Sequence, residues 1–172
     1  MNKQLHLEFE KAVRLLSQHF PISKPDSRKP VFFHVLRVGV RLYEEDYPHN
    51  VVLGGLLHDA LEWSDMSEQL LREEFGGSVA NIVVANTKNR AIEDSTERIQ
   101  DLARRCVECG VDALIVEAAD TIDSFRHYSK THNENEIRYC VRKATAMFKY
   151  KPEDWNDPIF DELKQWEEKH TS

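Results

Sequence analysis

Apolar residues recur along almost the whole chain at the three- and four-residue spacing of an amphipathic helix, and no segment alternates in the manner of a half-buried strand. A proline-rich stretch over 21–30 interrupts this pattern, and Gly76, Gly77 and Gly110 interrupt it further on. The pattern predicts helices over residues 5–20, 30–43, 51–63, 67–76, 78–86, 95–109, 111–130, 133–150 and 159–170, with polar loops over 87–94 and 151–158. We therefore predict an all-α fold arranged as a helical bundle.

The segment over 51–63 differs from the others because it is apolar nearly all round, which predicts that it is the buried central helix. Its run from Val51 to Leu57 is the longest apolar run, yet its seven residues fall far below the roughly 20 that span a membrane. The first residues lead straight into an amphipathic pattern without the apolar core of a signal peptide. We expect a soluble, cytoplasmic protein with no membrane partner.

Length and composition are those of one domain. A chain of 172 residues with 41% hydrophobic residues can build one substantial core, so we expect a single domain over 1–172. Its core covers about 24–150, and a C-terminal helix covers about 159–170. The net charge of −7 argues against a nucleic-acid partner, since phosphate contacts need a basic face. Three cysteines fit a reducing cytoplasm, and the sequence does not specify an oligomeric state.

Two strong metal-ligand residues, His58 and Asp59, are embedded in the apolar segment that is predicted to be buried. A buried imidazole or carboxylate is costly without a partner, and a divalent cation supplies the compensating charge. On a helix the two residues lie about 100° apart, so both can reach an ion beside the helix. His34 and Asp120 are of the same type and would arrive from other helices. Alone, such a residue is usually a hydrogen-bonded core residue or a helix cap, but the combination favours a metal site.

Two imidazoles and two carboxylates suit a manganese, iron, cobalt, nickel or zinc ion and leave coordination positions for water and a phosphate oxygen. A metal of this kind lowers the pKa of bound water, so that a nucleophile forms near neutral pH. The chemistry that these residues indicate is hydrolysis of a phosphoester or pyrophosphate bond.

The series His34, His58-Asp59 and Asp120 resembles that of the HD-domain metal-dependent phosphohydrolases over roughly residues 24–150. Within that superfamily the chain is most similar to the (p)ppGpp 3′-pyrophosphohydrolase domains of the stringent-response enzymes and to their small stand-alone relatives. The matching segments are His34 to Val38, His58 to Trp63, Phe75-Gly76 with Asn86 to Lys88, and Ala119 to Ser124. The resemblance implies an all-α HD-type domain with a divalent metal, manganese in the first place, and a small nucleotide as substrate.

Two positions depart from the family pattern. Trp63 stands where an acidic residue is expected, and Ser124 stands where an asparagine is expected. In the resembled enzymes the missing acid and the glutamate before it orient or activate the attacking water. That glutamate, Glu62, lies one helical turn beyond His58 and three residues beyond Asp59, which predicts that it faces the metal. Glu62 is the candidate general base and Asp59 the second catalytic residue, with a supporting or surface carboxylate as the alternative for Glu62.

Phosphate recognition requires basic side chains near the metal ligands. Lys24, Arg28 and Lys29 precede the second predicted helix. They match in type and place the basic residues with which the resembled (p)ppGpp hydrolases bind their nucleotide. Lys88, in the polar loop over 87–94, and Ser124 are further candidates for substrate binding. The alternative for any one of the basic residues is an ordinary solvated surface position.

Three functions compete. The first is a manganese-dependent nucleotide pyrophosphohydrolase that releases pyrophosphate from ppGpp. The second is a phosphomonoesterase of the same superfamily that releases orthophosphate from nucleoside monophosphates, and Trp63 and Ser124 favour it. The third is a nucleotide-binding regulatory module whose catalysis has decayed, and the four intact ligand positions count against it. Trp63 either packs in the core, the commoner role of a tryptophan in an apolar helix, or stacks on the base.

Overall fold

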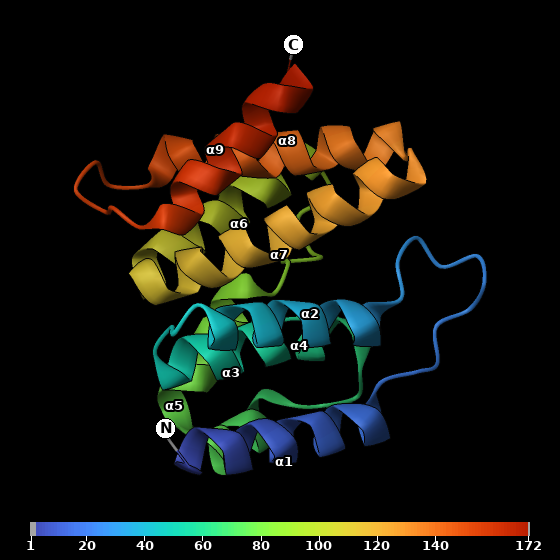
Figure 1. Cartoon of the computed structure of the whole chain (residues 1–172), viewed down its shortest axis with the longest axis vertical. Coiled ribbons are helices and arrows are strands. Elements are labelled where there is room, and N and C mark those ends of the chain that lie inside the picture. Colours follow the sequence, from blue (N-terminus) through green and yellow to red (C-terminus); the bar gives the residue numbers. More distant parts are fainter. Residues whose placement is uncertain (1–2, 172) are drawn as a thin grey trace. The chain divides into compact units, whose positions relative to one another are not determined.

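The computed structural model describes residues 3–171, and every regular element in that range is a helix (Figure 1). The helices are α1 (Lys3–His19), α2 (Val31–Glu44), α3 (His49–Leu57), α4 (Ala60–Trp63), α5 (Glu68–Asn86), α6 (Ser95–Cys109), α7 (Val111–Thr131), α8 (Glu134–Tyr150) and α9 (Pro158–Thr171). The predicted all-α fold is confirmed. The chain forms two compact units, the N-terminal unit (Met1–Thr87) and the C-terminal unit (Lys88–Ser172). The single domain expected over the whole chain stays a prediction.

Helix α3 forms the centre of the N-terminal unit, where it contacts α1, α2 and α5. All residues from Val51 to Leu57 are buried, as the all-round apolar sequence predicts. Glycines let the neighbouring helices approach closely. A β-carbon at Gly54 would lie 2.6 Å from Ile82 Cγ2, and one at Gly39 would lie 2.9 Å from Leu56 Cβ. The dense packing around α3 therefore depends on residues that have no side chain.

The helix predicted over 51–63 is divided in the structure at His58 and Asp59, although the backbone angles of both residues stay in the right-handed helical region. Helix α3 ends directly before this pair, and the single turn of α4 begins directly after it. The imidazole of His58 explains the break, since its Nδ1 lies 2.7 Å from the carbonyl oxygen of Gly55. A continuous helix would bond that carbonyl to the amide of Asp59, so the side chain competes for the acceptor. The pair thus forms a junction, where Asp59 has φ −90° and ψ 0°.

Helix α5 contains the break that its glycines predict. Ser67 caps the start, and its hydroxyl accepts a hydrogen bond from the amide of Leu70 at 3.1 Å. Gly76 has φ 82° and ψ 170°, a conformation that residues with a β-carbon disfavour. The helices predicted over 67–76 and 78–86 are therefore two segments of one kinked element.

Helix α7 is the centre of the C-terminal unit and contacts α6, α8 and α9. Its residues from Ala113 to Phe125 are all buried, so it has no solvent-facing stripe over that stretch. Asp94 caps α6 by accepting hydrogen bonds from the amides of Thr96 and Glu97. Gly110, with φ 127°, separates α6 from α7. Local signals therefore set the ends of these helices within a residue or two of their predicted bounds.

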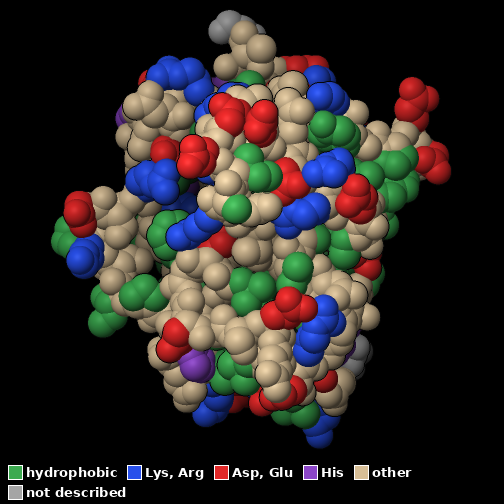
Figure 2. Space-filling view, turned by 180° about the vertical axis from the view of Figure 1, so that it is seen from behind, with side chains coloured by type: hydrophobic (Ala, Val, Ile, Leu, Met, Phe, Trp, Pro, Cys, Tyr) green, Lys and Arg blue, Asp and Glu red, His purple; other side chains and the backbone are tan. Residues whose placement is uncertain are grey.

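The described surface carries charges of both signs. On the face drawn in Figure 2, acidic and basic side chains lie interspersed. None of the described helices is long and apolar enough to cross a membrane. The expectation that no nucleic acid binds stays a prediction.

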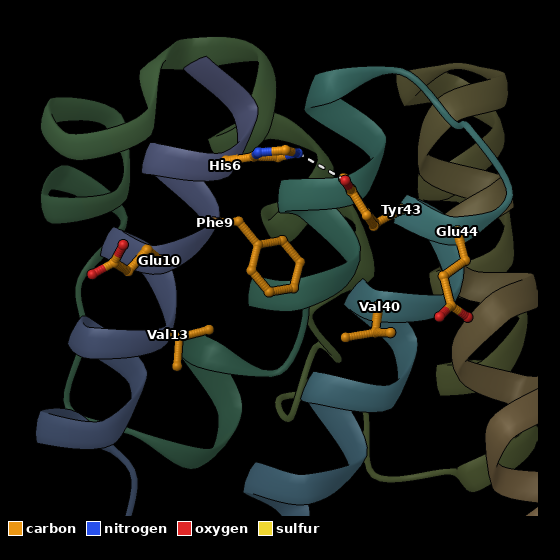
Figure 3. A pocket seen from close by; sticks show the side chains of 7 residues that line it. All are labelled: His6, Phe9, Glu10, Val13, Val40, Tyr43 and Glu44. Atoms are coloured by element: carbon orange, nitrogen blue, oxygen red, sulfur yellow. Dashed lines mark hydrogen bonds between the residues drawn. The ribbon is translucent and has the colours of Figure 1, made fainter. Parts of the chain in front are cut away.

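A cavity of about 570 Å³ opens between α1 and α2 in the N-terminal unit (Figure 3). Phe9 and Val13 face it from α1, and Val40 and Tyr43 face it from α2. The hydroxyl of Tyr43 lies 2.7 Å from Nε2 of His6 at its edge. The described lining of this cavity includes no residue that the sequence predicts to bind metal or substrate.

Candidate metal centre

Three of the four predicted metal ligands, His34, His58 and Asp59, lie together in the interior of the N-terminal unit. His34 is on the first turn of α2, and the other two form the junction between α3 and α4. Nε2 of His34 is 3.8 Å from Oδ2 of Asp59, and Nε2 of His58 is 3.5 Å from the same oxygen. The two imidazole rings meet edge to face, with centroids 5.2 Å apart. Two ring nitrogens and one carboxylate oxygen therefore face one another.

Hydrogen bonds around the two imidazoles determine where their lone pairs point. A carbonyl oxygen only accepts, so the Nδ1 of His58 that lies 2.7 Å from the Gly55 carbonyl carries a proton. A neutral imidazole protonated at Nδ1 presents its lone pair at Nε2. Nε2 of His34 lies 2.8 Å from the ammonium of Lys29, which only donates, so this nitrogen is an acceptor as well. Nε2 of His58 thus has its lone pair on the side of Asp59, whereas the lone pair of His34 Nε2 accepts the hydrogen bond from Lys29, which must move aside before that nitrogen binds a metal.

The spacing of these groups fits a divalent metal ion better than it fits direct contacts among them. Separations of 3.5 and 3.8 Å between the ring nitrogens and Oδ2 of Asp59 are too long for good hydrogen bonds between these atoms. Imidazole nitrogen and carboxylate oxygen are suitable donors for manganese, iron, cobalt, nickel and zinc. The bond from His58 to the Gly55 carbonyl also orients the ring, as such bonds do in metal-bound histidines. The donor set therefore fits a divalent metal.

Lys29 brings a positive charge to this cluster. Its ammonium lies 2.8 Å from Nε2 of His34, so one of the basic residues predicted to bind phosphate is directly beside the candidate ligands. Lys24 and Arg28 belong to the same loop before α2 and are exposed. A flexible ammonium next to a metal site can bind the phosphate oxygens of a substrate. Of the three, Lys29 has the strongest geometric support, and all three roles stay predictions.

Glu62 and Trp63 occupy the single turn of α4. The amides of both bond to the carbonyl oxygen of Asp59, at 3.1 and 3.0 Å, which attaches this turn to the ligand residue. The role of Glu62 as a base stays a prediction. Of the two roles considered for Trp63, full burial in the core does not occur, since 38% of its surface is exposed, and stacking on a base stays a prediction. Ala60, the first residue of α4, is still buried, so burial ends within this single turn.

Asp120, the fourth predicted ligand, is a buried residue of α7 in the C-terminal unit. Its Oδ2 accepts a hydrogen bond from the ammonium of Lys143 at 2.6 Å, and the same ammonium lies 2.7 Å from Oε1 of Glu117. The hydroxyl of Ser124 donates to Oδ1 of Asp120 at 3.3 Å. Two carboxylates and one ammonium thus share a buried site. The roles of Asp120 as ligand and of Ser124 as substrate contact stay predictions.

Lys143 and Glu117 were not among the residues predicted from the sequence to belong to the site, although a local signal marks both. Lys143 falls between Cys140 and Met147 on the inward stripe of α8, and Glu117 lies inside an apolar stretch of α7. A charged residue at a predicted core position indicates a buried partner of opposite charge. That signal does not say where in the chain the partner lies.

These buried charges shift one another's pKa values. Burial raises the pKa of Glu117 and outweighs the opposing charge of Lys143, while Asp120 raises it further and Lys88 acts to lower it. For Lys143, burial alone would lower the pKa. The charges of Asp120 and Glu117 outweigh burial and hold the pKa of Lys143 well above the usual value. Lys143 is therefore a cation at neutral pH, and the predicted role of Lys88 in substrate binding stays a prediction.

Sequence comparisons match this chain to known proteins. A family model described as HD domain matches residues 12–149. The chain is 25% identical over 163 residues to the guanosine-3′,5′-bis(diphosphate) 3′-pyrophosphohydrolase of Aquifex aeolicus, a match that covers 92% of this chain and 23% of the relative. It is 26% identical over 116 residues to guanosine-3′,5′-bis(diphosphate) 3′-pyrophosphohydrolase MESH1 of Danio rerio, covering 67% of this chain and 53% of that protein. The match thus spans about a quarter and about half of these two relatives.

A solved structure gives a matching fold. It is described as a metazoan orthologue of SpoT that hydrolyses ppGpp, and it has a TM-score of 0.73 to this chain. The match covers 98% of this chain and 96% of that one at 17% sequence identity. At this identity the likeness concerns the fold alone.

Proposed function

We propose that this chain, which belongs to the HD domain family, hydrolyses guanosine 3′,5′-bis(diphosphate) to GDP and pyrophosphate with the help of a divalent metal ion. The observation that carries the proposal is the buried cluster in which Nε2 of His34, Nε2 of His58 and Oδ2 of Asp59 face one another. The names of the curated relatives support the choice of substrate. In this proposal the protein is a cytoplasmic enzyme that acts on a small nucleotide.

The proposed ligands are His34, His58, Asp59 and Asp120, and the proposed ion is manganese. Two imidazoles and two carboxylates leave positions on such an ion for other oxygen atoms. When bound, the metal lowers the pKa of a water molecule and withdraws charge from a phosphate oxygen. Burial of these ligands excludes bulk water from their charges, which strengthens the electrostatic interactions at the site.

The chain's own residues position the substrate and move the proton. Lys29, beside His34, binds an oxygen of the 3′-pyrophosphate through its ammonium. Glu62 accepts the proton that the attacking water gives up. The water oxygen bonds to the phosphorus next to the ribose, the bond from that phosphorus to the 3′ oxygen breaks, and the 3′ oxygen takes up a proton to give GDP. Further proposed contacts of the nucleotide are Lys24, Arg28, Lys88 and Ser124.

A phosphomonoesterase that acts on nucleoside monophosphates is the second candidate. The exposed position of Trp63 favours it, because an indole in place of the family's second acid can stack on a base but cannot activate water. Both candidates use the same metal ligands. They differ in the phosphorus species that is released.

Product analysis separates the candidates. The full chain is loaded with Mn²⁺ and incubated with ppGpp and with a panel of nucleoside 5′-monophosphates, and we expect GDP and pyrophosphate from ppGpp. Asp59→Asn removes a ligand charge at nearly constant volume. We expect it to lower the rate about a thousandfold, or roughly 4 kcal/mol of transition-state stabilisation. Asp154→Asn, at an exposed aspartate before α9, is the matched control and keeps the wild-type rate.

Each other outcome has a defined meaning. Orthophosphate from the monophosphates, with ppGpp unchanged, would favour the second candidate. A protein that binds Mn²⁺ and ppGpp but forms no product would be a regulatory module. A rate that Asp59→Asn does not change would overturn the metal site itself.

A further inference from the structure

Lys143 is buried in the C-terminal unit, and its ammonium contacts two carboxylates on one side of α7. Glu117 and Asp120 are three residues apart, so one helical turn brings their negative charges to the same face. In a poorly screening interior these carboxylates repel each other. Lys143, at 2.7 and 2.6 Å, holds together two groups that would otherwise separate.

The three groups retain one net negative charge, because one ammonium faces two carboxylates. A lysine that contacted Asp120 alone would cancel the charge of that carboxylate and compete with a metal ion for it. Since Glu117 shares the ammonium, Lys143 can hold Asp120 without cancelling the negative charge of the site. The arrangement is suited to a cation at Asp120.

Lys143 also sets the direction of the Asp120 carboxylate. Its bond to Oδ2 is short and charge-assisted, at 2.6 Å, whereas the bond from Ser124 to Oδ1 is long, at 3.3 Å. A carboxylate is planar, so a partner that holds one oxygen fixes the position of the other. Of these two contacts, the one with the ammonium is the shorter and the stronger, so it has the larger effect on how Asp120 presents its oxygens.

We propose that Lys143 is a positioning residue for metal binding, which holds Asp120 in the orientation of a ligand and is itself held by Glu117. The inference rests on the proposed function, in which Asp120 is a ligand. Partners outside the ligand set change metal affinity about 10- to 100-fold when they are removed. Lys143 acts through Asp120 and contacts no substrate in this proposal. Its loss therefore affects metal affinity and kcat more than the KM for the nucleotide.

Two variants separate the two roles that Lys143 could have, which are to orient Asp120 and to neutralise the buried carboxylates. Lys143→Met keeps the length of the side chain but leaves two buried carboxylates facing each other, and we expect it to destabilise the fold. The double variant, Lys143→Met with Glu117→Gln, removes the ammonium and its second partner together. It therefore tests positioning in a protein without that buried repulsion. Lys149→Met, at an exposed lysine of the same helix, is the matched control.

Three measurements on the full chain give the answer: Mn²⁺ affinity by titration calorimetry, the unfolding temperature by circular dichroism, and kcat and KM for ppGpp. We expect the double variant to unfold near the wild-type temperature and to bind Mn²⁺ about 10- to 100-fold more weakly. Its kcat falls while its KM for ppGpp stays near the wild-type value. Lys149→Met matches the wild type in all three.

The alternative outcomes are distinct. Wild-type Mn²⁺ affinity in a folded double variant would overturn the inference and leave the proposed function intact, because Lys143 would then only neutralise Glu117. A double variant with a lower unfolding temperature, a lower kcat and a higher KM would show that Lys143 has a structural role, and this would overturn the positioning role. A wild-type protein that binds no Mn²⁺ and releases no product would overturn the proposed function, and the inference with it.

Discussion

The two compact units hold their buried ionisable groups in different ways. In the N-terminal unit, two histidines face Asp59 at 3.5 and 3.8 Å, which is longer than a hydrogen bond. In the C-terminal unit, Lys143 contacts Asp120 and Glu117 at 2.6 and 2.7 Å, the distances of charge-assisted hydrogen bonds. Each set has a lysine beside it, but Lys29 lies against an imidazole nitrogen of the first set, whereas Lys143 lies between the two carboxylates of the second. Burial of charge alone therefore does not mark a metal site. A metal site is recognised by the distances between the buried groups and by the protons that these groups carry.

The central helices of the two units also pack differently. Helix α3 depends on close approach at glycines, where an added β-carbon would overlap a neighbouring residue. Helix α7 is buried through side chains of all kinds, among them Glu117 and Asp120. We therefore expect the N-terminal unit to be sensitive to added volume and the C-terminal unit to be sensitive to the removal of charge.

The largest effect on stability is expected from breaking the charge pairing in the C-terminal unit. Lys143→Met leaves two buried carboxylates without their cation, and such a loss costs about 3–5 kcal/mol of the free energy of unfolding. Adding Glu117→Gln removes the repulsion and restores most of that stability. Urea unfolding followed by circular dichroism measures both changes. We expect the free energy of unfolding of Lys149→Met to stay within about 0.5 kcal/mol of the wild-type value. If Lys143→Met did the same, the contacts of Lys143 with Glu117 and Asp120 would not contribute to stability.

A smaller effect is expected from adding one methyl group in the N-terminal unit. The β-carbon of Gly39→Ala would lie 2.9 Å from Leu56 Cβ and 3.1 Å from its Cα, and backbone atoms cannot move aside as a side chain can. We expect a loss of about 1–3 kcal/mol in the same unfolding experiment.

Gly77→Ala is the matched control for this substitution. Its nearest neighbour is Arg72 Nη1 at 3.6 Å, an ordinary contact at the end of a flexible side chain. A helical alanine there is expected to be neutral or to stabilise by up to about 1 kcal/mol. Equal losses at the two glycines would contradict the role of close approach at α3.

The smallest expected effect concerns the reactivity of the cysteine thiols. All three cysteines lie in the C-terminal unit. Burial raises the pKa of the Cys106 thiol well above its usual value, and the charge of Glu117 adds to this, so little thiolate forms at pH 8. Cys140 is buried as well, whereas Cys109 is exposed. We expect iodoacetamide to modify Cys109 first and the other two only after unfolding. Peptide mass spectrometry checks this, and equal labelling of Cys106 and Cys109 in the native protein would mean that the unit opens readily.

The helices and most of their ends follow from the sequence, because the signals that set them are local. Ser67 begins α5 through its own hydroxyl, and Gly110 separates two helices through its own backbone freedom. The metal chemistry was predicted for a similar reason. Histidine and aspartate in an apolar run are costly without a partner whatever surrounds them. The structure brings His34 to the His58-Asp59 pair as that reasoning requires.

Tertiary structure decided what no local pattern contains. The apolar segment continues to Trp63 in the sequence, yet 38% of the surface of Trp63 is exposed at the end of the single turn of α4. Lys143 meets Asp120 across 23 positions of the chain. Helical periodicity says which face of α8 is buried, but a buried ammonium is stable only where another helix presents carboxylates to it. Periodicity is a property of neighbouring residues, whereas the pairing of buried charges is a property of the packing that brings distant residues together.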